Sequence, residues 1–205
     1  MHPMRAIMVW AVLASAVAVP LVVAGTSPLL AWRDPIYILG GFAGIVALCL
    51  LLFQPLLATG SLPGVMTARS RRLHRWVGAA LVVAVVIHVA GLWMTSPPDI
   101  IDALTFTAPT PFSAWGVIAM WALFAAALMG VLRRRLRLRP LLWRKVHASL
   151  AGLVVIGSAV HALLIEGTME TVSKSVLCLL VLAASAMAVV RLRIFSGPEK
   201  PRRGL

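Results

Sequence analysis

Acidic residues are scarce in this chain of 205 residues, which has six Asp and Glu against 19 Lys and Arg. Cysteine is scarcer still: the two cysteines form neither CxxC nor CxxCH, so neither a redox dithiol nor covalently attached haem is indicated. No GxGxxG or other nucleotide-binding stretch occurs. Ser, His and carboxylate residues are not clustered as hydrolysis would require. These absences argue against a disulfide oxidoreductase, a nucleotide-binding enzyme and a hydrolase.

Apolar residues dominate what is present. The chain is 61% hydrophobic and 12% charged, and its mean hydropathy is +0.98. No soluble domain of this length could bury so much apolar surface, so the lipid bilayer must be part of its solvent. The net charge of +13 would otherwise suggest nucleic acid. Because the basic residues cluster between apolar runs, we expect no nucleic-acid partner.

Six stretches have the roughly 20 mainly apolar residues that a transmembrane helix needs. They predict an all-α integral membrane protein, a six-helix bundle in which residues 1–205 form a single domain. The predicted helices lie near residues 6–25, 36–58, 74–94, 113–132, 146–165 and 174–192. The first span could instead be a signal peptide, since Arg5 precedes it, but its apolar run exceeds the usual length of about 7–15 residues.

The placement of charge predicts the direction of the spans. With the N-terminus in the cytoplasm, all but two of the 19 basic residues fall on the inner side, the exceptions being Arg33 and Lys174. Most of the acidic residues then fall outside. The positive-inside rule therefore predicts cytoplasmic N- and C-termini for a multi-pass protein of the inner (plasma) membrane. The basic inner face could also attract anionic lipid or an acidic partner.

Four of the five histidines fall on the third and fifth predicted helices. His74 and His88 are fourteen residues apart, and so are His147 and His161. Fourteen residues fall only about 40° short of four full helical turns and rise about 21 Å, so each pair shares a face. The two helices run parallel, because one span separates them. The sequence thus predicts that His74 is level with His147, and His88 with His161.

Two stacked histidine pairs restrict the metal chemistry. One tetrahedral zinc site would need ligands that converge, and these spread over about 21 Å. Two zinc sites would each lack ligands, since no Cys, Asp or Glu accompanies either pair. A six-coordinate haem iron needs only two axial ligands from the protein. The pattern predicts an inner haem iron bound by His74 and His147 and an outer one bound by His88 and His161.

Three arginines could take part in binding the inner haem. Arg72, Arg75 and Arg144 lie beside the inner pair in sequence and could bind haem propionates, although positive-inside bias explains any single Arg equally well.

Two alternative functions of the histidines stay open. The histidines could be hydrogen-bonding glue of a structural membrane subunit. They could also form the proton or metal relay of a transporter, which predicts further polar groups in the spans, and Gln54 is the best candidate.

The segments RLHRWVG, IHVAGL and LLWRKVHASLAGLVVIGSAVHALL resemble the ferric reductase-like transmembrane domain. That family includes ferric reductases, the membrane half of NADPH oxidases and the haem-binding subunit of the bacterial periplasmic methionine-sulfoxide reductase. The resemblance implies six helices and two b-type haems. It also implies four ligands in the third and fifth helices, which carry over onto His74, His88, His147 and His161.

One departure from the family concerns the electron donor. Many members continue into cytoplasmic FAD- and NAD(P)H-binding domains, and no flavin or nicotinamide domain is recognisable here. We therefore expect a separate donor: a cytoplasmic flavin reductase, reduced FAD or FMN, or a membrane quinol. The expected acceptor on the outer side is a ferric chelate, a periplasmic redox protein or oxygen. The predicted function is transmembrane electron transfer, as the haem-bearing subunit of an oxidoreductase.

Overall fold

The structure is a computed structural model, and it describes residues 3–194 as a bundle of helices. Within that range there are no strands, and six helices are long and apolar enough to cross a membrane, as predicted. A short helix, α4 (Pro97–Leu104), and a single 3-10 turn (Pro28–Leu30) lie in connections. The six long helices are α1 (Pro3–Gly25), α2 (Pro35–Ala58), α3 (Thr67–Thr95), α5 (Pro111–Leu136), α6 (Pro140–Leu164) and α7 (Thr171–Arg191).

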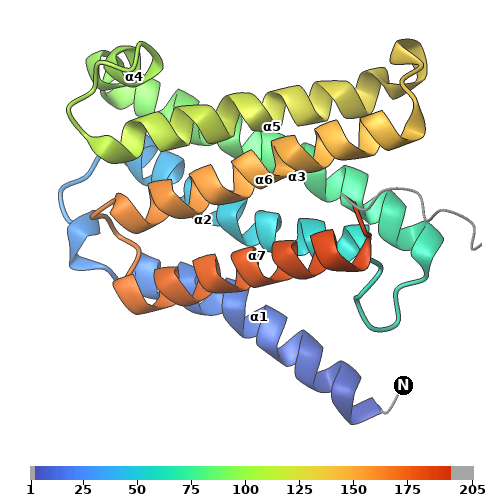
Figure 1. The fold of residues 1–205 in the computed structure, drawn as a ribbon. Helices are drawn as coiled ribbons and strands as arrows, with labels where there is room; N and C mark the ends of the chain where they lie inside the picture. Colours follow the sequence, from blue (N-terminus) through green and yellow to red (C-terminus); the bar gives the residue numbers. More distant parts are fainter. Residues whose placement is uncertain (1–2, 195–205) are drawn as a thin grey trace, which may run out of the picture.

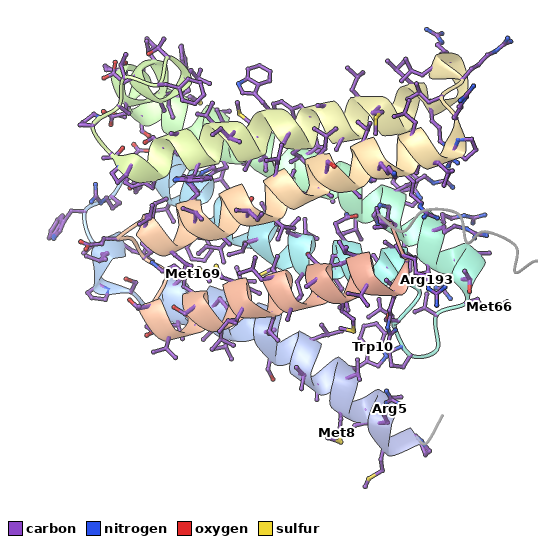
Figure 2. All side chains as sticks on the ribbon, viewed as in Figure 1. Arg5, Met8, Trp10, Met66, Met169 and Arg193 are labelled. Atoms are coloured by element: carbon purple, nitrogen blue, oxygen red, sulfur yellow. The ribbon has the colours of Figure 1, made fainter. Side chains whose placement is uncertain are left out.

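The connections gather at two opposite ends of the bundle (Figure 1). One end, on the right, holds the α2–α3 and α5–α6 connections, the start of α1 and the end of α7, and the other holds α4 and the α6–α7 connection. Figure 2 places Arg5 and Arg193 at the first end and Met169 at the second. We call the first the basic end, because it holds arginines such as Arg5 and Arg193. We call the second the acidic end, because it holds Asp99, Asp102 and the α6–α7 connection with Glu166. Both described termini lie at one end, as six crossings require.

Several helices extend beyond the apolar runs that predicted them. Helix α3 begins at Thr67, seven residues before the predicted start, and α6 begins at Pro140 rather than near 146. Both extensions contain arginines, which propagate a helix well but lower its hydropathy. Helix α4 occupies the connection between α3 and α5, although two prolines stand in its first turn. Pro97 starts this helix, where a missing N–H and a fixed φ are well tolerated.

Two helical hairpins form the frame of the bundle. Helix α2 packs along α3 and α5 packs along α6, whereas α3 and α6 are not among the closely packed pairs. Glycines permit the close contacts inside each hairpin: a Cβ added at Gly91 would lie 3.0 Å from the Cα of Gly40, and one at Gly157 would lie 3.0 Å from the carbonyl oxygen of Trp115. Helix α7 contacts α2 and α6. The histidine-bearing helices α3 and α6 therefore face each other across a gap between the hairpins.

Candidate functional site

His88 on α3 and His161 on α6 meet near the acidic end. Their ring centroids are 6.4 Å apart and the ring planes are inclined by 81°. Nδ1 of His88 lies 2.8 Å from the carbonyl oxygen of Gly40, and Nδ1 of His161 lies 2.8 Å from that of Phe112. A carbonyl can only accept a hydrogen bond, so each Nδ1 carries the proton. Each Nε2 is then left with a free lone pair, the form that binds a metal.

A glycine makes room for each of these rings. Gly44 lies one helical turn after Gly40, and a Cβ there would be 2.9 Å from Nδ1 of His88. Gly116 lies one turn after Phe112, and its Cβ would be 2.6 Å from Nδ1 of His161. Both hairpins thus hold a histidine with the same arrangement, a backbone carbonyl and a glycine four residues later. Gly44 and Gly116 could not be predicted as part of the site, because nothing in the sequence shows which carbonyl a ring will meet.

His74 and His147 form the second pair, near the basic end. Their ring centroids are also 6.4 Å apart, with planes inclined by 67°. Nδ1 of His74 lies 3.2 Å from the carbonyl oxygen of Gln54, fourteen residues along α2 from the carbonyl that meets His88. His147 differs, because its buried Nδ1 has no hydrogen-bond partner among the described residues. Its ring instead stacks on Trp143, with centroids 5.0 Å apart and planes 8° apart.

The glutamine that could have belonged to a polar relay is used inside a hairpin. Nε2 of Gln54 donates to the carbonyl oxygen of His74 at 3.4 Å, while the backbone of Gln54 accepts from the ring of His74. Both contacts join α2 to α3. They give Gln54 a packing role beside the histidine.

The predicted arginines lie at the basic end, in two settings. Arg72 and Arg75 are exposed and line an open surface hollow together with Trp76 and Ala79. Arg144 is half-buried and donates through Nη2 to the carbonyl oxygen of Arg193 at 3.1 Å. Its Nε and the indole Nε1 of Trp143 are buried donors without partners among the described residues. Unpaired buried donors beside His147 suit a carboxylate-bearing ligand.

A cavity of about 550 Å³ lies between the hairpins at the acidic end. His88 and His161 line it, together with Gly44, Gly116 and residues of α4 and of the α6–α7 connection. Most of the other lining side chains are apolar, and the polar ones come from the ends of the helices and their connections. Cavities of roughly 300–1,000 Å³ with apolar walls and few polar groups are typical of cofactor sites.

The geometry of both pairs fits a bis-histidine haem. A metal–imidazole bond is about 2 Å and the ring centroid lies about 1 Å further, so rings on opposite sides of one ion have centroids about 6 Å apart. The observed 6.4 Å agrees at both levels. Within residues 3–194, no three His, Cys, Asp or Glu residues come together as a metal site. Two histidines suffice only if the remaining ligands belong to the cofactor, as they do in a porphyrin.

Fold and site together define a polytopic membrane protein with paired intramembrane histidines at two depths. The family described as "Ferric reductase like transmembrane component" matches residues 43–158, more than half of the chain, and the protein belongs to this family. The resemblance seen in the sequence is thereby confirmed. The matched range includes His74, His88 and His147, and His161 lies three residues beyond it. Searches of curated proteins and of solved structures found no match.

Proposed function

We propose that this protein conducts electrons across the membrane through two b-type haems, one held by His74 and His147 and one by His88 and His161. The observation that supports the proposal most directly is the repeated 6.4 Å separation of paired rings on facing helices, in a member of this family. Bound haem supplies a one-electron carrier whose potential depends on its ligands and surroundings.

The residues around the rings prepare them as ligands. The carbonyls of Gln54, Gly40 and Phe112 each fix the orientation and tautomer of one ring and raise the basicity of its Nε2. Apolar side chains form most of the cavity wall around His88 and His161. Arg72, Arg75 and Arg144 provide the cations that would bind propionates at the basic end.

The two sites lie near opposite faces of the membrane. Fourteen residues separate the histidines of each helix, which corresponds to about 21 Å of a hydrocarbon core about 30 Å thick. Electrons would therefore cross the insulating layer between two fixed positions inside one bundle.

The partners follow from the predicted orientation, with the basic end in the cytoplasm and the protein in the inner (plasma) membrane. The donor is a separate flavin reductase with FAD or FMN, or a membrane quinol. The acceptor at the acidic end is a ferric chelate or a periplasmic redox protein. In this scheme the chain is the haem-bearing subunit of an oxidoreductase, with the bilayer as its solvent.

A visible spectrum of the purified protein tests the proposal. We expect a sharp reduced-minus-oxidised b-type band and two haems per chain. His88→Ala should remove the acidic-end haem and leave the other, and adding His161→Ala should cost nothing more, because both serve one iron. His2→Ala, which changes the histidine outside the pairs, is the control. A folded, haem-free preparation from iron-replete cells would contradict the function, and full haem content in His88→Ala would contradict the pairing.

Vesicles then test transfer itself. Oriented protein should pass electrons from a reductant on one side to an impermeant acceptor on the other. The His88→Ala protein, which retains one haem, should fail to do so. Equal rates for the two proteins would contradict a path that uses both sites.

A further inference from the structure

Lys174 is a buried cation in the first turn of α7, near the acidic end. The residue is only 6% exposed. Its Nζ donates to the carbonyl oxygen of Ile165, at the end of α6, over 2.6 Å. Among residues 3–194, no carboxylate oxygen lies within 4.0 Å of this ammonium group. The exposed carboxylate of Glu170, one turn earlier on α7, interacts electrostatically with Lys174 but forms no ion pair with it. The charge is thus removed from water without a directly bonded anion.

Capping α6 accounts for only part of this arrangement. A lysine near a helix C-terminus favourably satisfies a free carbonyl, and Ile165 is such a residue. An ammonium group has three donors, however, and this bond uses one. Burying an unpaired charge costs far more than one hydrogen bond returns, which is why buried charges are almost always paired.

Lys174 shares a cavity with the histidines of the acidic end. Lys174 lines the same cavity as His88 and His161, and among the described residues it is the only Lys or Arg that does so. The carboxylates that line the cavity belong to Asp99, Asp102 and Glu166, all exposed. An anionic ligand that entered between the histidines would therefore meet three like charges and a single cation.

We propose that Lys174 binds a propionate of the haem held by His88 and His161, and so positions that haem in the acidic-end site. The inference rests on the proposed function and names the residue that recognises the cofactor's carboxylate at this site. It gives the acidic end a counterpart of the arginines at the basic end. It also explains the burial of Lys174, because the propionate supplies a directly bonded anion, which the described residues do not.

The first test is a haem titration in which only one site can fill. In the His74→Ala background, which removes the basic-end haem, apoprotein is titrated with haem and followed by its visible spectrum. Lys174→Gln keeps a donor for Ile165 but removes the charge, and should weaken haem binding at least about tenfold, the effect of one lost charge-assisted hydrogen bond. Lys174→Arg should stay within about threefold of the parent. Arg33→Gln removes an exposed cation from the same end and should change nothing.

The second test changes the ligand instead of the protein. Haem dimethyl ester lacks free carboxylates, so the parent protein should bind it at least about tenfold more weakly than haem. Lys174→Gln should lose most of this preference for haem over its ester, keeping only what the second propionate contributes. Should Lys174→Gln fail to fold, the ester comparison in the parent and in Lys174→Arg decides: equal affinities for ester and haem overturn the inference.

The outcomes separate the two proposals. If Lys174 only caps α6, Lys174→Gln will be less stable but will bind haem as tightly as its parent, and the inference fails while the proposed function stands. If Lys174→Gln distinguishes haem from its ester as strongly as the parent does, other groups bind the propionates and the inference is overturned. If the unmodified protein binds no haem, the proposed function fails first.

Discussion

The ring of His161 lies directly against Gly116, so close that a Cβ there would be 2.6 Å from its Nδ1. The contact also keeps the ring within 2.8 Å of the Phe112 carbonyl, one turn away on α5. His88 lies against Gly44 in the same way. Gly116→Ala should therefore displace the imidazole of His161 and remove the acidic-end haem, halving the haem content. A pyridine haemochrome assay measures the haem content per chain.

Gly130→Ala is the matched control for that change, because Gly130 is on the same helix and a Cβ there meets nothing within 4 Å. It should keep both haems. A Gly116→Ala protein with full haem content would show that the ring tolerates displacement, and would weaken the case for a rigid axial ligand.

Trp143 stacks on His147, the one paired histidine whose Nδ1 has no carbonyl partner among the described residues. Its indole stacks on His147 and is itself covered by the guanidinium of Arg133, 4.3 Å from the ring centroid. Stacked aromatic pairs contribute about 0.5–1.5 kcal/mol. Trp143→Leu should weaken haem binding at the basic end by about two- to tenfold and leave the acidic end unchanged, as measured by haem titration. Trp121→Leu, at an exposed position on α5, should affect neither site.

Gln54 distinguishes electron transfer from a polar relay. Gln54→Leu removes the long 3.4 Å bond to the His74 carbonyl but keeps the backbone carbonyl that accepts from the His74 ring. Haem content and transfer rate in vesicles should then stay within about twofold of the parent, since the lost bond is weak. Loss of transfer with both haems retained would favour the relay instead.

Glu170 makes the stability of α7 depend on pH. Its carboxylate accepts from the backbone N–H groups of Ser173 at 2.7 Å and Val172 at 2.6 Å, and these bonds lower the pKa of Glu170 below its ordinary value of 4.5. A lowered pKa means that the stabilisation is fully present above 4.5 and is lost as pH falls through the lower folded value.

Glu170→Gln should accordingly have a lower Tm than the parent at about pH 7, and the difference should close as pH falls below 4.5. Differential scanning fluorimetry across that range measures it. Glu166→Gln is the control, because Glu166 accepts no such bond within the described residues. If the difference in Tm between the two proteins persisted unchanged at acid pH, the loss of stability would come from the changed side-chain geometry and not from the lost negative charge.

The six crossings could be predicted from the sequence, because each needs only an apolar run long enough to span the bilayer. The pairing of the histidines could be predicted too, because a spacing of fourteen residues places two side chains on one face of a helix. Hydropathy could not predict α4, whose prolines are tolerated only because they start the helix, nor the basic first turns of α3. His74, His88, His147 and His161 meet in space as predicted, and their role as haem ligands stays a prediction.

The finer features of the site depend on contacts between distant segments. Gly44 and Gly116 matter only because particular rings lie against them, and Trp143 only because it stacks on His147. Lys174 looked like an ordinary outer cation by its position in the sequence. Its burial follows from the way α7 packs against the end of α6, which no local pattern records.

The gap between the two hairpins has a consequence for how the protein is assembled. Each hairpin is internally complete, with its own glycine contacts and its own histidine helix, so each can form as it leaves the translocation machinery. Every proposed iron takes one ligand from each half, and neither half alone can coordinate a porphyrin on both faces. Cofactor delivery would then be the event that locks the two halves in register, and iron starvation would leave the hairpins joined only through the packing of α7 on α2 and α6.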